Sequence, residues 1–128
     1  MKNLRVATTT AFTLSLTASF AIVAQEQETP KSKFLGNFAG AMVASFKCKS
    51  WKINTPEVGL LMGYLHITTK DISPDGPDWP VFQQNMLRAE NDTKDLDANA
   101  MCSAAEGMFG PKGTVAPNLM IPAASEHQ

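Results

Sequence analysis

Apolar residues recur every three or four positions in the stretch SKFLGNFAGAMVASFKCKS. Phe34, Phe38, Met42 and Phe46 follow one another at steps of four. Side chains at this spacing share one face of an α-helix. The pattern therefore predicts an amphipathic helix over residues 32 to 50, with its apolar face turned toward a core.

A second apolar run begins at Thr55, which suits a helix N-cap. Pro56 fits the first helical position and Glu57 the first turn. The apolar residues that follow cover most of the helical cylinder: Val58, Leu60, Leu61, Met62, Tyr64, Leu65 and Ile67. Because a helix that is apolar all round is usually buried, we expect residues 55 to 67 to form a central helix. The end of this run, YLHITT, is also compatible with a strand.

Two more helices are expected after the segment TTKDISPDGPDWP, whose three prolines and one glycine break the pattern. Asp78 is expected to cap a helix that runs to about Glu90, with Phe82 on its inner face. Asp95 is expected to cap the fourth helix, which Gly110 ends.

The last part of the chain, residues 111 to 128, contains turn-forming residues without a period. This pattern is typical of a flexible tail, although Leu119, Met120 and Ile121 could still dock on the domain. The predicted fold class is all-α: one domain over residues 25 to 110, built as a small bundle of about four helices.

The first 24 residues have the organisation of a secretory signal peptide. Lys2 and Arg5 are followed by an uncharged run over residues 6 to 24, with small residues at Ala21 and Ala24. A retained membrane anchor is the alternative, but the many threonines and serines of the run dilute its hydrophobicity. We therefore expect export to the periplasm, cleavage of the signal peptide and no stable membrane insertion afterwards.

The chain has two cysteines, Cys48 and Cys102. In an exported protein, two cysteines are read most simply as one disulfide. A disulfide between Cys48 and Cys102 closes a long loop of the chain. In the chain-entropy description, closing this loop stabilises the fold by about 4 kcal/mol. Their surroundings contain no C-x-x-C, haem-attachment or zinc-ligand spacing.

Several function classes are disfavoured by charge and composition. Without residues 1 to 24, the chain has nine basic and twelve acidic side chains. This balance provides no excess of positive charge for binding nucleic acid. His66 lies on an apolar element, where a histidine is usually a partly buried core residue. No serine lies in a G-x-S-x-G setting, and no glycine-rich phosphate loop is present. We expect a protein that is not an enzyme and carries no cofactor.

The break between the second and third helices contains half of a calcium-binding pattern. Asp71, Ser73, Asp75 and Gly76 match the first part of an EF-hand loop. The twelfth position, which requires a glutamate, is Phe82. A turn that leads into the third helix explains the same residues, and we predict no metal site.

Glycines four residues apart occur in both of the first two helices, as Gly36 with Gly40 and as Gly59 with Gly63. The missing side chains let two helix backbones approach closely, at some cost in helix propensity. Tight packing inside the domain is the simplest interpretation. The seam of a homodimer or a membrane contact would use the same device.

This general plan resembles the small periplasmic acid-stress chaperones of the HdeA/HdeB type. The shared features are a signal peptide, a short helical mature chain, and one long-range disulfide that corresponds here to Cys48 and Cys102. Trp51 follows the first cysteine, whereas the tryptophan or threonine of that family precedes it. The resemblance implies a protein that exposes apolar surface at low pH and holds unfolding clients. Neutralised carboxylates such as Glu57, Asp78, Asp95 and Asp97 would loosen the bundle in acid.

A dedicated partner is the alternative: the chain would act as an inhibitor, an immunity-type protein or an accessory subunit of one envelope complex. The candidate partner-binding residues are Lys47, Lys49, Trp51 and Lys52, since a tryptophan among cations is a plausible anchor. A solvated helix end explains the same four residues.

Overall fold

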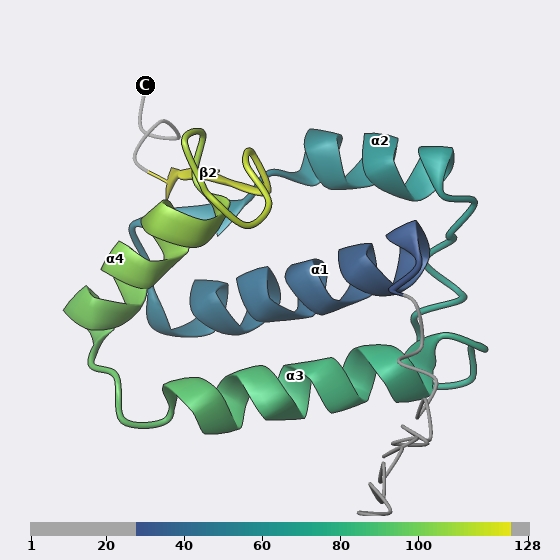
Figure 1. The fold of residues 1–128 in the computed structure, drawn as a ribbon, viewed down its shortest axis with the longest axis horizontal. Helices are drawn as coiled ribbons and strands as arrows, with labels where there is room; N and C mark the ends of the chain where they lie inside the picture. Colours follow the sequence, from purple (N-terminus) through teal and green to yellow (C-terminus); the bar gives the residue numbers. More distant parts are fainter. Residues whose placement is uncertain (1–27, 124–128) are drawn as a thin grey trace, which may run out of the picture.

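The computed structural model describes residues 28 to 123 (Figure 1). The predicted signal peptide and the last five residues lie outside this range. The elements in chain order are α1 (Pro30–Lys47), β1 (Trp51–Ile53), α2 (Thr55–Tyr64), α3 (Trp79–Thr93), α4 (Ala98–Phe109) and β2 (Met120–Pro122).

Helix α1 lies at the centre, between α2 and α3, and α4 crosses near its C-terminal end (Figure 1). Two contacts show that α1 and α3 run in the same direction. At the start of both helices, Lys31 Nζ lies 2.9 Å from Oδ2 of Asp78, an ion pair without hydrogen-bond geometry. At their ends, Lys47 Nζ donates to the carbonyl oxygen of Thr93 at 2.9 Å. Parallel neighbours need a long return connection, which α2 and the following loop provide.

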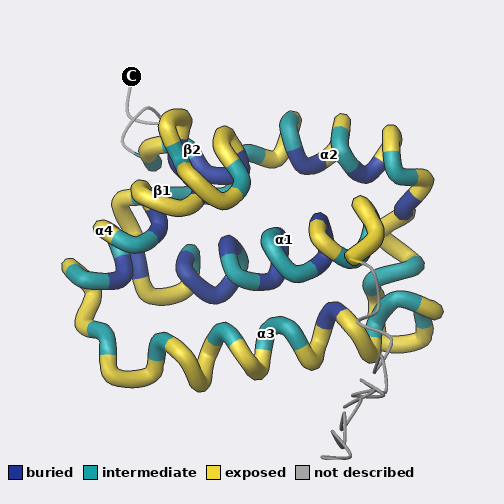
Figure 2. The backbone as a smooth tube through the Cα atoms, viewed as in Figure 1, coloured by how far each residue is buried: buried dark blue, intermediate teal, exposed yellow. Residues whose placement is uncertain are grey.

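The core is centred on α1, which packs on α3 and on α4, and most of the buried positions lie on α1 and α4 (Figure 2). The rings of Phe34 and Phe38 stack with centroids 5.6 Å apart, and Phe38 stacks on Phe82 of α3 at 5.5 Å. The predicted disulfide is confirmed: Cys48 and Cys102 are bonded, with their Cα atoms 5.1 Å apart. It ties the end of α1 to α4.

The prediction of an all-α fold is correct only in outline, because a small antiparallel sheet completes the domain. Strand β1 pairs with β2, with Trp51 opposite Pro122 and Ile53 opposite Met120.

The prediction of a flexible tail from residue 111 is wrong up to residue 123. Leu119 and Met120 are 1% and 0% exposed, because the tail returns to pair with β1 and packs against the core.

Helix boundaries differ from the predictions where capping was misassigned. Helix α1 ends at Lys47, since Cys48 already has an extended backbone. Asn54, not Thr55, is the N-cap of α2. Asp97, not Asp95, caps α4: its Oδ1 accepts a hydrogen bond from the backbone N–H of Ala100 at 2.8 Å.

Helix α2 is shorter than expected and does not lie at the centre. Only Val58 and Met62 of its residues are buried, whereas Leu60 and Tyr64 are 71% and 83% exposed. His66, expected in the core, is exposed and has a positive φ of 56° just after the helix end. None of the helices within residues 28 to 123 combines the length and apolar character needed to cross a bilayer.

Candidate binding surfaces

The outer face of α2 is an uncharged, largely apolar surface. We call it the α2 patch and define it as Pro56, Gly59, Leu60, Gly63 and Tyr64, all of which are exposed. At 3.6 residues per turn, these five positions lie within one half of the helix circumference. No heavy atom outside the local chain would contact a Cβ placed on Gly59 or Gly63, so the backbone itself is open to a neighbour.

The α2 patch exists because the opposite side of the helix supplies the core. Val58 and Met62 are buried, and Leu61 and Leu65 pack against the core. Single apolar residues on a surface are ordinary, but a contiguous apolar patch marks an interaction site in soluble proteins. This helix was predicted to be buried because its apolar residues identify no outer face. Gly59 and Gly63 share one side of the helix, but glycines at this spacing were interpreted as a packing seam and do not by themselves indicate exposure.

A cavity of about 370 Å³ adjoins the α2 patch. It lies between α1, α2 and the segment before β2, with Phe34, Leu61 and Leu119 among its walls. Tyr64 belongs to both the cavity wall and the patch. A side chain bound on the patch therefore has an adjoining recess to enter, which is mainly apolar but has Lys33 and Glu57 in its wall.

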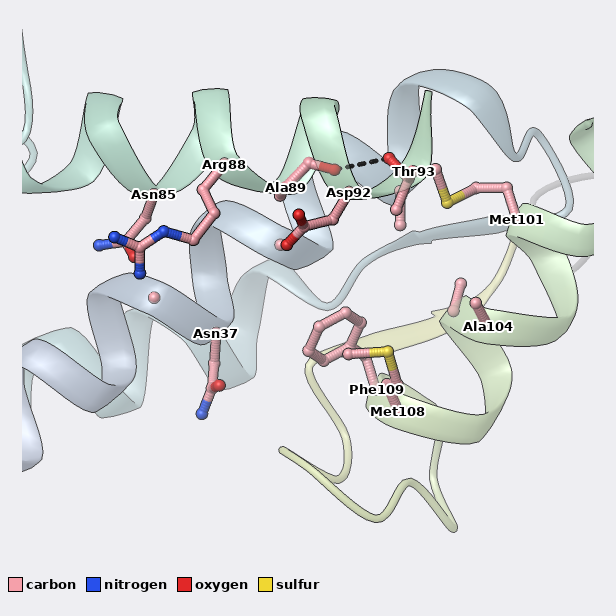
Figure 3. A pocket seen from close by; sticks show the side chains of 14 residues that line it. Asn37, Asn85, Arg88, Ala89, Asp92, Thr93, Met101, Ala104, Met108 and Phe109 are labelled. Atoms are coloured by element: carbon pink, nitrogen blue, oxygen red, sulfur yellow. Dashed lines mark hydrogen bonds between the residues drawn. The ribbon is translucent and has the colours of Figure 1, made fainter. Parts of the chain in front are cut away.

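A separate groove of about 250 Å³ runs between α1, α3 and α4 (Figure 3). Its walls are mainly apolar and include Met101, Met108 and Phe109 from α4. Gly40 of α1 lies against this wall, since a Cβ there would lie 3.2 Å from Cζ of Phe109. The prediction of tight packing is therefore confirmed at Gly40, but not for the open pair Gly59 and Gly63.

Arg88 and Asp92, one turn apart on α3, supply the charges of this groove. The lining residues from α1 and α4 carry no charged side chain. Within residues 28 to 123, neither the guanidinium of Arg88 nor the carboxylate of Asp92 forms an ion pair. No pattern in the sequence marks either residue, because their place in the groove depends on how α3 packs on the other helices.

The four candidate partner-binding residues near the first cysteine have different surroundings. Lys47 holds the end of α3 through the carbonyl of Thr93. Trp51 packs against the core beside Gly110, and strand alternation directs Lys52 to the other face of β1. Lys49 is exposed in the turn between α1 and β1. Two of these residues, Lys47 and Trp51, thus make contacts that stabilise the fold.

The loop with the partial calcium pattern is organised by a carboxylate. Oδ2 of Asp71 accepts a hydrogen bond from the backbone N–H of Thr68 at 2.8 Å, and the Asp71 N–H donates back to Thr68 Oγ1 at 3.2 Å. The hydrogen bond from the Thr68 N–H lowers the pKa of the Asp71 carboxyl group most, the Thr68 side chain lowers it further, and Lys31 and Lys70 add smaller effects in the same direction. In the described part of the chain, no three acidic, histidine or cysteine side chains are placed to hold a metal ion.

No protein-family model, no curated protein and no solved structure matches this chain.

Proposed function

We propose that the protein is an exported, non-catalytic binding protein that holds other proteins through the α2 patch. The observation that carries this proposal is the exposure of Leu60 and Tyr64, at 71% and 83%, on a face without charge. Transfer of apolar surface out of water gains about 25 cal/mol per Å², so a client's apolar segment gains free energy by covering this face.

A chaperone that responds to acid is the form of this function that we favour. Three carboxylates hold junctions of the fold: Asp71 organises the loop after α2, Asp78 pairs with Lys31, and Asp97 caps α4. At Asp71, whose pKa is lowered most by the hydrogen bond from the Thr68 N–H, protonation in acid removes this stabilisation, because the neutral carboxyl group is a poorer acceptor. The disulfide still joins α1 to α4, so acid loosens the domain without releasing the whole chain.

The test is the aggregation of an acid-sensitive client enzyme, followed by light scattering at pH 3 and at pH 7. We expect the mature protein to slow aggregation at pH 3, and Leu60→Ser to reduce this effect several-fold. Leu87→Ser is the matched control, since Leu87 is also exposed, at 58%, but lies on α3. The proposal fails if the wild type has no effect at either pH, or if both variants lose the effect equally.

A single dedicated partner is the alternative outcome. In that case the protein would leave client aggregation unchanged at both pH values. It would also recover one protein from the cell envelope in a fixed ratio, and Leu60→Ser would abolish that recovery.

A further inference from the structure

The groove between α1, α3 and α4 changes in polarity from one end to the other. Figure 3 shows Arg88 and Asn85 at one end and Met101, Ala104 and Met108 at the other, with Asp92 between them. Asn85 is fixed there because its Nδ2 donates to the carbonyl of Val81 at 2.9 Å. One end therefore offers a cation, and the other offers only apolar surface.

We infer that this groove binds a free alkyl carboxylate of medium chain length. The carboxylate would pair with the guanidinium of Arg88, whose planar fork of donors matches the two oxygens of a carboxylate. The aliphatic chain would lie along the apolar wall toward Met101. The reverse orientation is disfavoured because the ligand's carboxylate would then leave the guanidinium and lie against apolar surface.

The size of the groove limits the length of the ligand. A volume of about 250 Å³ equals that of roughly eight liquid water molecules at about 30 Å³ each. This volume suits a single chain of about eight carbons and is too small for the two chains of a membrane phospholipid.

Gly36 gives an independent reason to regard the groove as more than a packing gap. A glycine inside a helix costs about 1 kcal/mol relative to alanine. A Cβ on Gly36 would lie 3.6 Å from Oδ1 of Asn85, which is an ordinary contact, so packing does not require glycine there. Gly36 lines the groove, and the absence of its side chain keeps the groove open beside Arg88 and Asn85.

The test is a titration of ¹⁵N-labelled mature protein with sodium octanoate, octylammonium chloride and 1-octanol, followed by NMR. We expect octanoate to bind most tightly and to shift amides of α1, α3 and α4 around the groove. Arg88→Gln should weaken octanoate binding about threefold to fivefold, because it removes a charge pair at an exposed guanidinium. Asp92→Asn should tighten octanoate binding and weaken octylammonium binding.

A matched pair of variants tests where the aliphatic chain of the ligand lies. Gly36→Leu places a side chain in the groove and should abolish octanoate binding, whereas Gly59→Leu makes the same change on open surface and should preserve it. Arg88 is exposed, so Arg88→Gln keeps the test valid even if Gly36→Leu does not fold.

The inference is overturned if the three ligands bind equally, if Arg88→Gln binds octanoate as the wild type does, or if only dioleoylphosphatidylglycerol vesicles shift the groove amides. It does not rest on the proposed function. Leu60→Ser should bind octanoate normally even though it loses protection of clients, so the two proposals fail separately.

Discussion

Reduction of the disulfide between Cys48 and Cys102 should remove a large part of the stability of the domain. The two residues are 54 apart in sequence. In the chain-entropy description, a loop of this length restricts the unfolded chain by about 4 kcal/mol. Small domains have total stabilities of about 5 to 15 kcal/mol, so reduction should leave a marginally stable fold.

The measurement is urea unfolding of the same chain in its oxidised and reduced forms, followed by circular dichroism. The reduced form should lose about 4 kcal/mol in the free energy of unfolding and melt about 20 °C lower. Its m-value should rise, because the released unfolded chain exposes more surface. The variant in which both cysteines are alanine controls for the reductant, to which it should not respond. A loss below about 1 kcal/mol would refute the reasoning.

Three other predictions concern stability. Leu119→Ala should destabilise the domain by about 3 kcal/mol in urea unfolding, because Leu119 is buried in the core, whereas in a flexible tail it would lie in solvent. Gly59→Ala should stabilise the domain by about 1 kcal/mol, because alanine has the higher helix propensity. Gly40→Ala should lose that gain, because the new methyl group crowds Phe109, and equal melting temperatures for the two variants would contradict the packing described. The lowered pKa of Asp71 stabilises the fold above the ordinary value of 3.8, and this stabilisation is lost as pH falls through the folded pKa. Asp71→Asn should therefore be less stable at pH 7 and show a smaller further loss in acid titrations; an unchanged acid dependence would contradict the role of that carboxylate.

The parts of the fold that sequence predicts best are those with a clear period. The spacing of Phe34, Phe38 and Met42 indicates both that α1 is a helix and which side faces the core. Helix α2 was recognised as a helix, but its uniformly apolar pattern identifies no outer face, and Leu60 was wrongly expected to be buried.

Features that depend on contacts between distant segments could not be predicted in the same way. Strands β1 and β2 have three residues each, which is too few to show a period. They pair although most of the domain's sequence lies between them. The disulfide was predictable because a chain with two cysteines offers one pairing. The α2 patch and the groove at Arg88 were not, because exposure and proximity depend on how the helices pack.

Photo-crosslinking from the α2 patch tests the proposed binding of proteins most directly. A photoreactive amino acid replaces Leu60 in one variant and Leu87 in a control, and cells expressing each are irradiated at neutral and at acid pH. The account predicts crosslinks to envelope proteins from position 60 that increase in acid, with few from position 87. Equal crosslinking from both positions, or none from position 60 at either pH, would contradict it.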